Sequence, residues 1–398
     1  MFTLNSKYDE VIIYAETIEQ EAISQITQMA NSPIGEDAHI RIMPDAHAGK
    51  GCVIGTTMKF NGKICPNIVG VDIGCGVVAY HLTCTDIDLD RLDKVCREVI
   101  VSGQAARDKA VYLQMQADTL SELYCWKYLH KKDYLYKSLG TLGGGNHFIE
   151  LNRAEDGSYW LLIHSGSRNL GKQVAEYYQK LAEQVIVNEH LAVRADLIES
   201  LKMQGRQSEI EVELAKVPRR PATGLEYLEG GNAKDYLHDM DICQVWAQSN
   251  REIIAKDIIN AMDWEYNGVI ESIHNYIDLS SETVRKGAIS AQKNELCLIP
   301  LNMRDGTLIC RGKGNPDWNY SAPHGAGRIM SRAKAKELIS LEDFQDTMKD
   351  VYSSTVCRET IDESPFAYKD MEEIMTVIEP TVQIIERIIS IYNFKATS

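Results

Sequence analysis

Short apolar runs, bounded by glycine, proline, asparagine or aspartate, predict the β-strands of this chain. The predicted strands cover residues 11–15, 39–43, 68–82, 159–164, 269–276, 296–300 and 307–310. Glycines interrupt the third run within residues 71–76, so we expect a bend there. Two of the runs, 159–164 and 269–276, carry at or near their ends a histidine with candidate chemistry, His164 and His274.

Helical periodicity predicts three longer elements, at residues 88 to about 120, 171–217 and 233–262. The middle element is rich in Glu, Lys, Gln and Ala. We expect residues 172–221 to form a helical hairpin that lies on the body of the protein or projects from it. Pro218 and Pro221 would end it, because proline cannot continue a helix.

The chain has no repeat, low-complexity tract or Pro/Gly/Ser-rich linker that would mark a domain boundary. Residues with candidate chemistry are spread from Asp45 to Lys395. If they build one site, residues 1–398 form a single intertwined domain. We therefore predict an α+β fold in which helices surround mixed β-sheets.

The formal net charge of −15 argues against a general nucleic-acid coat, because counterion-release binding needs a broad basic surface. It is compatible with an enzyme that grips a strand end with a few arginines near bound metal ions. Ten cysteines without a CxxC pair indicate reduced thiols, hence a cytoplasmic protein, with one or two available as metal ligands. The N-terminus does not read as a signal peptide, and no apolar run reaches the roughly 18 residues of a membrane span, so we expect no membrane association.

Three segments combine small residues with metal-binding or hydrogen-bonding side chains. In residues 43–51, Asp45 could cap a turn or could hydrogen-bond a catalytic imidazole and fix its tautomer. In residues 71–76, Asp72 and Cys75 could converge on one ion, or could be a turn aspartate beside a buried cysteine. Residues 140–150 contain three consecutive glycines, which can turn N–H groups toward a phosphate, and there is no Walker P-loop elsewhere.

Histidines at strand ends extend this set. A lone histidine in such a place is commonly satisfied by the backbone. Together, His147, His164 and His274 with Asp72 and Cys75 make a candidate site for one or two metal ions with N, S and O ligands.

Residues 321–328 (SAPHGAGR) set His324 among small residues and beside an arginine. Gly325, Ala326 and Gly327 would let a bulky anionic group approach the imidazole, and Arg328 could hold its phosphate oxygens. With the five candidate ligands upstream, His324 becomes a candidate nucleophile that faces a metal site.

Taken together, these motifs resemble the RtcB family of RNA-splicing ligases. The blocks that carry the resemblance run from about Asp45 to Lys395 in the order PDAHAGKG, VGVDIGCG, GGGNHFIE, HSGSR, HNY, GKGNP, SAPHGAGRIMSR, ESPFAYKD and NFKA. So many rare blocks in one order are very improbable by chance.

The resemblance implies a role for each candidate residue. His324 would be the guanylylated nucleophile, oriented by Asp45. The ligands of two Mn²⁺ ions would be Asp72, Cys75, His147, His164 and His274. The guanine nucleotide would contact Asn146, Glu150, Tyr368 and Lys395, beside the small residues 325–327. RNA phosphates would contact Arg168, Arg328 and Arg332.

The implied reaction joins an RNA 3′-phosphate or 2′,3′-cyclic phosphate to a 5′-hydroxyl, with GTP, through histidine–GMP and RNA(3′)pp(5′)G intermediates. Residues 299–306 depart from the Pro-Gly-Ser-Met-Gly stretch of many family members, so the resemblance does not assign this part of the nucleotide pocket. A metal-dependent phosphohydrolase or a 3′-phosphate capping enzyme is therefore the alternative, and a silent RNA-binding scaffold a third class. The natural RNA and the need for an archease-like activator stay open.

Overall fold

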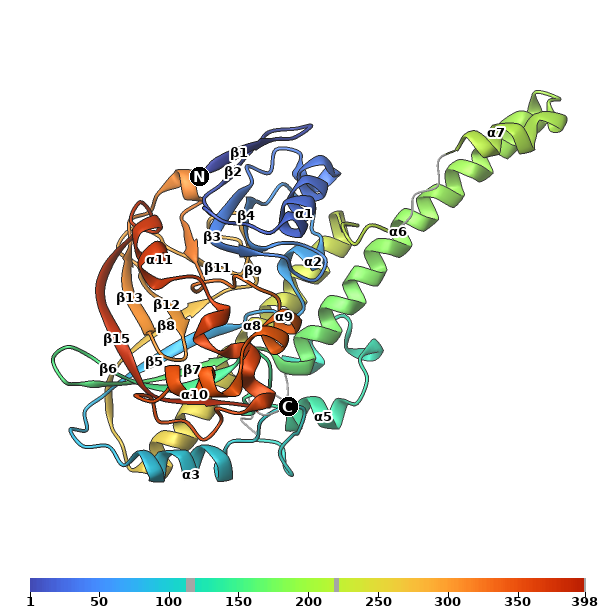
Figure 1. The fold of residues 1–398 in the computed structure, drawn as a ribbon. Helices are drawn as coiled ribbons and strands as arrows, with labels where there is room; N and C mark the ends of the chain where they lie inside the picture. Colours follow the sequence, from blue (N-terminus) through green and yellow to red (C-terminus); the bar gives the residue numbers. More distant parts are fainter. Residues whose placement is uncertain (112–118, 218–221, 397–398) are drawn as a thin grey trace.

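The computed structural model describes residues 1–111, 119–217 and 222–396, in which helices surround three β-sheets (Figure 1). The predicted α+β fold is confirmed. A six-stranded sheet has the order β1-β2-β3-β4-β10-β9, from β1 (Phe2–Asn5), β2 (Glu10–Ile13), β3 (Arg41–His47), β4 (Ile54–Lys59), β9 (Tyr276–Asp278) and β10 (Thr283–Lys286). A two-stranded sheet pairs β11 (Ala288–Ser290) with β14 (Ser321–Pro323).

A seven-stranded sheet forms the second half of the body. Its order is β12-β13-β15-β6-β7-β5-β8, from β5 (Gly76–Leu82), β6 (Phe148–Arg153), β7 (Tyr159–Ser165), β8 (Tyr266–Ile273), β12 (Leu296–Asn302), β13 (Gly306–Gly312) and β15 (Val382–Lys395). The two edge strands, β12 and β8, contact each other. The N–H of Leu298 in β12 donates to Oγ of Ser272 in β8 at 2.9 Å. The sheet therefore curls on itself, and apolar side chains from its inner face, including Val77, Leu162 and Ile388, pack together.

The register of this sheet brings five chain segments to one end. Gly76 lies opposite Ser165 and Ile273, and Phe148 lies opposite His164 and Lys395. The residues at or beside these strand ends include Cys75, His147, His164, His274 and Lys395. Strand pairing thus gathers residues that are up to 320 positions apart in the sequence.

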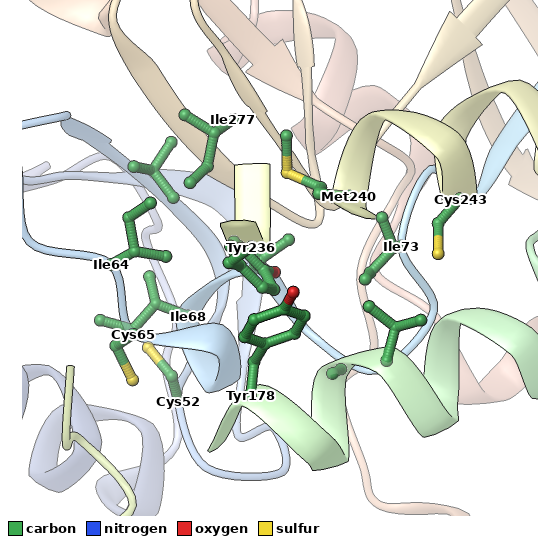
Figure 2. Close-up of a cluster of buried hydrophobic side chains, with 14 of the residues drawn as sticks. Cys52, Ile64, Cys65, Ile68, Ile73, Tyr178, Tyr236, Met240, Cys243 and Ile277 are labelled. Carbon is green, nitrogen blue, oxygen red and sulfur yellow. The ribbon is translucent and has the colours of Figure 1, made fainter. Parts of the chain in front are cut away.

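Helices cover the sheets. Their bounds are α1 (Gln20–Asn31), α2 (Pro66–Val69), α3 (Leu89–Val99), α5 (Lys132–Lys137), α6 (Arg168–Met203), α7 (Ile210–Lys216), α8 (Gly230–Met262), α9 (Arg332–Leu338), α10 (Leu341–Thr347) and α11 (Met371–Val377). Figure 2 shows part of the core in which α6 and α8 face α2, where the rings of Tyr178 and Tyr236 meet edge to face at 5.3 Å. No helix of the described residues has both the length and the apolar character needed to cross a membrane.

The predicted hairpin contains one long helix and one short one. Helix α6 begins at Arg168, is buried on one side as far as Ala182, and then extends away from the body (Figure 1). After the turn, α7 packs back on α6, where Arg194 donates to the carbonyl oxygen of Leu214 at 3.2 Å. Pro218 and Pro221 lie outside the described residues.

Two predicted elements are wrong at their ends. Residues 68–75 are not strand, because Pro66 starts the short helix α2 and the chain then turns through Gly70 and Gly74, both with positive φ. The helix predicted from residue 88 to about 120 ends at Val99, before the positive-φ turn at Gly103. Seven strands of the described residues were not predicted at all: β1, β4, β6, β10, β11, β14 and β15.

Candidate active site

One cluster of candidate metal ligands lies at the open end of the seven-stranded sheet. The sulfur of Cys75 is 3.5 Å from Nε2 of His147 and 3.4 Å from Nε2 of His164, and the three ligand atoms lie within 4.8 Å of one another. Oδ2 of Asp72 is 3.0 Å from the same nitrogen of His147. The ring of His274 is 5.4 Å from that of His164. The fold therefore brings all five predicted ligands together.

Backbone carbonyl groups fix the orientation of two of these imidazoles. Nδ1 of His147 donates to the carbonyl oxygen of Leu142 at 2.8 Å, and Nδ1 of His164 donates to that of Asn146 at 3.1 Å. Nε2 of His164 therefore carries a lone pair that points toward Cys75, whereas Nε2 of His147 faces both Cys75 and Asp72. This is the arrangement in which protein imidazoles bind metal.

Burial sets the protonation of the cluster. It lowers the pKa of His164 and of His274 well below the usual range, so both rings are neutral. It also raises the pKa of the Cys75 thiol well above the usual range, and a divalent cation would favour the thiolate. Burial opposes ionisation of Asp72, but the hydrogen bond with His147 and the charges of His147 and Arg168 outweigh it and lower its pKa to about 2. The donor set fits a metal site.

Small residues make this convergence possible. A side chain at Gly166 would place its Cβ 2.1 Å from Oδ1 of Asp72. Gly74 adopts φ of +69°, and a Cβ there would lie 2.9 Å from the backbone of Gln244 in α8. Both glycines are required by close approach, which explains the bend between Asp72 and Cys75.

Two buried polar residues of α8 support the cluster, and neither was predicted from the sequence. Asn250 accepts from the N–H of Gly140 at 2.7 Å and donates to the carbonyl oxygen of Thr141 at 3.0 Å. Arg251 donates to the carbonyl oxygens of Gly74 and Ser165, both at 2.9 Å. Their signal in the sequence is an Asn-Arg pair inside an otherwise apolar helix face.

The candidate nucleophile lies beside the cluster. Nδ1 of His324 donates to Oδ2 of Asp45 at 2.6 Å, and the ring of His324 is 4.7 Å from that of His274. Asp45 comes from β3 and is fully buried, whereas His324 directly follows β14. Nε2 of His324 therefore keeps its lone pair, and Asp45 holds the tautomer, as the sequence suggested.

A cavity of about 690 Å³ opens in front of His324. Its lining includes the predicted residues Asn146, Glu150, His164, Gly325, Ala326, Gly327, Arg328, Arg332, Tyr368 and Lys395. Pro300, Leu301, Asn302 and Met303, from the segment that departs from the family pattern, also line it. The cavity is therefore lined by His324, by the candidate metal ligand His164 and by cationic side chains. We call the part of its lining formed by Arg328, Arg332, Tyr368 and Lys395 the cationic side.

A family model described as tRNA-splicing ligase RtcB matches residues 25–131 and 126–396. The RNA-splicing ligase RtcB of Escherichia coli (strain K12) is 32% identical over 412 residues, which cover 92% of each chain. The tRNA-splicing ligase RtcB of Nanoarchaeum equitans (strain Kin4-M) is 26% identical over 428 residues, 85% of this chain and 84% of that one. This protein belongs to the RtcB family. The resemblance found in the motifs is confirmed.

In this RtcB-family chain, the cationic side of the cavity is organised by Glu363, which was not singled out from the sequence. Its carboxylate, 2% exposed, accepts from Nη1 of Arg332 at 2.5 Å, from the hydroxyl of Tyr368 at 2.7 Å and from Nζ of Lys395 at 2.9 Å. Nη1 of Arg328 is 3.3 Å away. Burial opposes ionisation of this carboxyl, but Lys395 and the two arginines outweigh it and lower its pKa to about 2.

Glu150, which also lines the cavity, is a much weaker acid than Glu363. Burial raises its pKa to about 7, although Lys395 and Asn393 act to lower it. Nδ2 of Asn393 donates to Oε1 of Glu150 at 2.6 Å, while Oε2 is buried with no hydrogen-bond partner among the described residues. An orphaned carboxyl oxygen beside a cavity is suited to a polar ligand group.

Arg168 is held away from the cavity lining. Its Nε donates to Oγ1 of Thr141 at 3.2 Å and its Nη2 to the carbonyl oxygen of Gly103 at 3.1 Å. Arg332 is tied to Glu363 and to Asp362, whose Oδ2 is 2.7 Å from Nη1. The arginines expected at RNA phosphates are thus fixed by protein partners in this structure.

Proposed function

We propose that this RtcB-family protein is a GTP-dependent RNA ligase that joins a 3′-phosphate or 2′,3′-cyclic phosphate end to a 5′-hydroxyl end. The observation that carries the proposal is the hydrogen-bonded Asp45–His324 pair, because His324 lines a cavity and lies beside the cluster of candidate metal ligands. The names of the relatives, RNA-splicing and tRNA-splicing ligases, support the same reaction class.

In the first proposed step, Nε2 of His324 attacks the α-phosphorus of GTP. The N–P bond forms, the bond to the β-phosphate oxygen breaks, and pyrophosphate leaves. The attacking imidazole becomes positively charged, and Asp45 stabilises that charge through the proton on Nδ1. A neutral imidazole suits this step because the lone pair on its Nε2 is nucleophilic.

Asp72, Cys75, His147, His164 and His274 would hold the metal, which we take to be two Mn²⁺ ions from the family resemblance. Bound metal would supply charge stabilisation for phosphate oxygens. The ligand set by itself, rich in sulfur and nitrogen, suits zinc at least as well.

In the later steps GMP would move from His324 to the RNA 3′-phosphate. The 5′-hydroxyl would then attack the phosphorus of this RNA 3′-phosphate, and GMP would leave. Glu150, Tyr368 and Lys395, with Asn146, would bind the guanine nucleotide at the cationic side of the cavity. Arg328 and Arg332, which line the cavity, would bind RNA phosphates, whereas Arg168 lies outside the lining and donates to Thr141 and Gly103. The proposed compartment is the cytoplasm, which the ten free thiols support.

A second candidate activity is 3′-end processing or capping without joining. Leu301 and Met303, from the segment that departs from the family pattern, lie in the cavity wall, so a change there can alter which group is bound. Incubation with a 3′-phosphate RNA, a 5′-hydroxyl RNA, GTP and Mn²⁺ separates the activities. A joined strand supports the ligase, a GMP-capped end supports capping, and a bare 3′-hydroxyl supports the phosphohydrolase.

A further inference from the structure

One surface segment departs from the acidic character of the chain. Residues 124–137 (YCWKYLHKKDYLYK) contain five aromatic residues and four lysines but a single acidic residue, in a protein with a formal net charge of −15. The segment includes a 3₁₀ helix at Trp126–Tyr128 and helix α5, and lies beside the start of α6 (Figure 1). Aromatic residues interleaved with basic ones are typical of surfaces that bind single-stranded nucleic acid.

Two aromatic side chains on this surface, those of Tyr124 and Tyr128, are exposed, whereas Trp126 is partly buried against the main core. Tyr124 is 59% exposed and Tyr128 is 49% exposed, whereas Leu123, Cys125 and Leu129 between and beside them belong to the main core. The exposure is therefore imposed by the fold.

The backbone under these rings is held in place. The carboxylate of the buried Asp239 accepts from the N–H groups of Tyr124 and Cys125 at 2.9 and 3.0 Å. The N–H of His130 donates to Gln173 of α6 at 2.7 Å, and Gln173 donates back to the carbonyl oxygen of His130 at 3.1 Å. Preorganised rings lose little entropy when a base stacks on them.

The lysines remain available for an anionic ligand. Nζ of Lys127 lies 4.8 Å from the ring centre of Tyr128, and Nζ of Lys132 lies 4.7 Å from that of Trp126. The acidic residue of the segment, Asp133, pairs with Lys137 at 2.8 Å. Within the described part of the chain, Lys127, Lys131 and Lys132 form no ion pair with a carboxylate.

A chain of contacts links this surface to the candidate active site. The hydroxyl of Tyr134 donates to the carbonyl oxygen of Gln104 at 2.9 Å, and the N–H of the adjacent Gly103 donates to Gly143 at 2.8 Å. Gly143 begins the glycine run that leads to Asn146 in the cavity wall. A Cβ added at Gly145 in this run would lie 4.0 Å from Nη2 of Arg332, which also lines the cavity.

From these observations we propose that Tyr124, Trp126, Lys127, Tyr128, Lys131 and Lys132 bind the unpaired nucleotides that precede the RNA end seated in the cavity. We call these six residues the aromatic–lysine surface. Bases would stack on the exposed rings, and lysines would bind the phosphates between them. The inference rests on the proposed function, since it assigns part of the RNA substrate to a place on the protein.

The test measures binding of two labelled 3′-phosphate RNAs, one of about 12 nucleotides and one dinucleotide. The double variant Tyr124→Ala/Tyr128→Ala should weaken binding of the longer RNA about tenfold. The variant Lys127→Gln/Lys131→Gln should lower the slope of log affinity against log salt by about 0.7 for each RNA phosphate that the protein no longer neutralises. Both variants should bind the dinucleotide, and label His324 with GMP, like the unaltered protein.

Matched controls are Tyr266→Ala, a 42% exposed tyrosine on β8, and Lys94→Gln, an exposed lysine on α3. Neither should change RNA binding. If the unaltered protein joins RNA, and Tyr124→Ala/Tyr128→Ala binds the longer RNA as tightly as the unaltered protein, the proposal that the aromatic–lysine surface binds RNA is wrong. If the unaltered protein is not labelled with GMP and does not join RNA, but the variants bind the longer RNA more weakly than it does, the aromatic–lysine surface is supported and the proposed function is wrong.

Discussion

The carboxylate of Glu363 interacts with four side chains that come from three separate segments of the chain. Two of them, Tyr368 and Lys395, are proposed to bind the nucleotide. Because hydrogen bonds to an ionised carboxylate are roughly twice as strong as neutral ones, this single group positions the cationic side of the cavity. We regard Glu363 as a positioning residue.

Replacing this charge should affect nucleotide binding more than bond making. Glu363→Gln keeps the shape of the side chain but loosens Tyr368 and Lys395, so we expect the KM for GTP to rise about tenfold, about 1.4 kcal/mol, with a smaller change in kcat. Steady-state guanylylation kinetics measure both. Glu359→Gln, an exposed position in the same 3₁₀ helix (Arg358–Glu363), is the matched control. An unchanged KM in the Glu363 variant would contradict this role.

The same residue predicts a pH dependence of stability. The pKa of Glu363 falls from its ordinary value of 4.5 to about 2 on folding, so the unfolded chain takes up a proton first as the pH falls. The contribution of the Glu363 carboxylate to the free energy of unfolding is complete above pH 4.5 and is lost as the pH falls toward 2. Denaturant unfolding at several acidic pH values should therefore show a shallower loss of stability for Glu363→Gln than for the unaltered protein. Equal slopes would refute the assignment.

Cys75 is the residue most directly tied to metal binding. Its sulfur faces two Nε2 atoms, so Cys75→Ser should remove most bound metal from protein purified with Mn²⁺ or Zn²⁺ and should also lower guanylylation at least 100-fold. Metal analysis by mass spectrometry checks this. Cys84→Ser, a half-buried thiol elsewhere, should retain both metal and activity. Full metal content in the Cys75 variant would exclude it as a ligand.

At the scale of elements, local sequence patterns predicted some of the strands whose ends carry candidate site residues. The apolar run before His164 is short and continuous, so β7 was found with its histidine in place. Strand β8 was predicted three residues too far along the chain, and His274 lies directly after its end. Strand β15 was missed because Glu386 and Arg387 interrupt its apolar pattern, and its partners β13 and β6 are distant in the sequence. Glu363 had no local signal, since its partners are brought to it only by the fold.

Helix α6 supports a separate prediction about the projecting arm. Buried positions on its body-facing side end at Ala182, and Gln179 lies 3.4 Å from Glu226, so the chain enters and leaves the arm at neighbouring points. Replacing residues 184–221 with a short Gly/Ser linker should leave the thermal midpoint within about 4 °C and guanylylation unchanged. Differential scanning calorimetry and the labelling assay check this. Loss of the folded state would show that the arm stabilises the body.

At the scale of the whole molecule, the site exists only because distant segments meet. The six-stranded sheet supplies Asp45, the two-stranded sheet leads into His324, and the strands of the seven-stranded sheet bring Lys395 and four of the five candidate metal ligands to one end. This arrangement supports our proposal that residues 1–398 form one domain, with residues 172–221 as an insertion. The order of motifs indicated this site from the sequence, whereas the cavity, Glu363 and the aromatic–lysine surface required the three-dimensional structure.

The central claim is that His324 becomes covalently guanylylated. The most direct measurement is incubation of the purified protein with α-labelled GTP and Mn²⁺, with ATP and Mg²⁺ as controls, followed by denaturing electrophoresis. We predict an acid-labile, alkali-stable label that requires GTP and is absent from His324→Ala. Equal labelling of His324→Ala, or no label in metal-loaded protein, would contradict this claim.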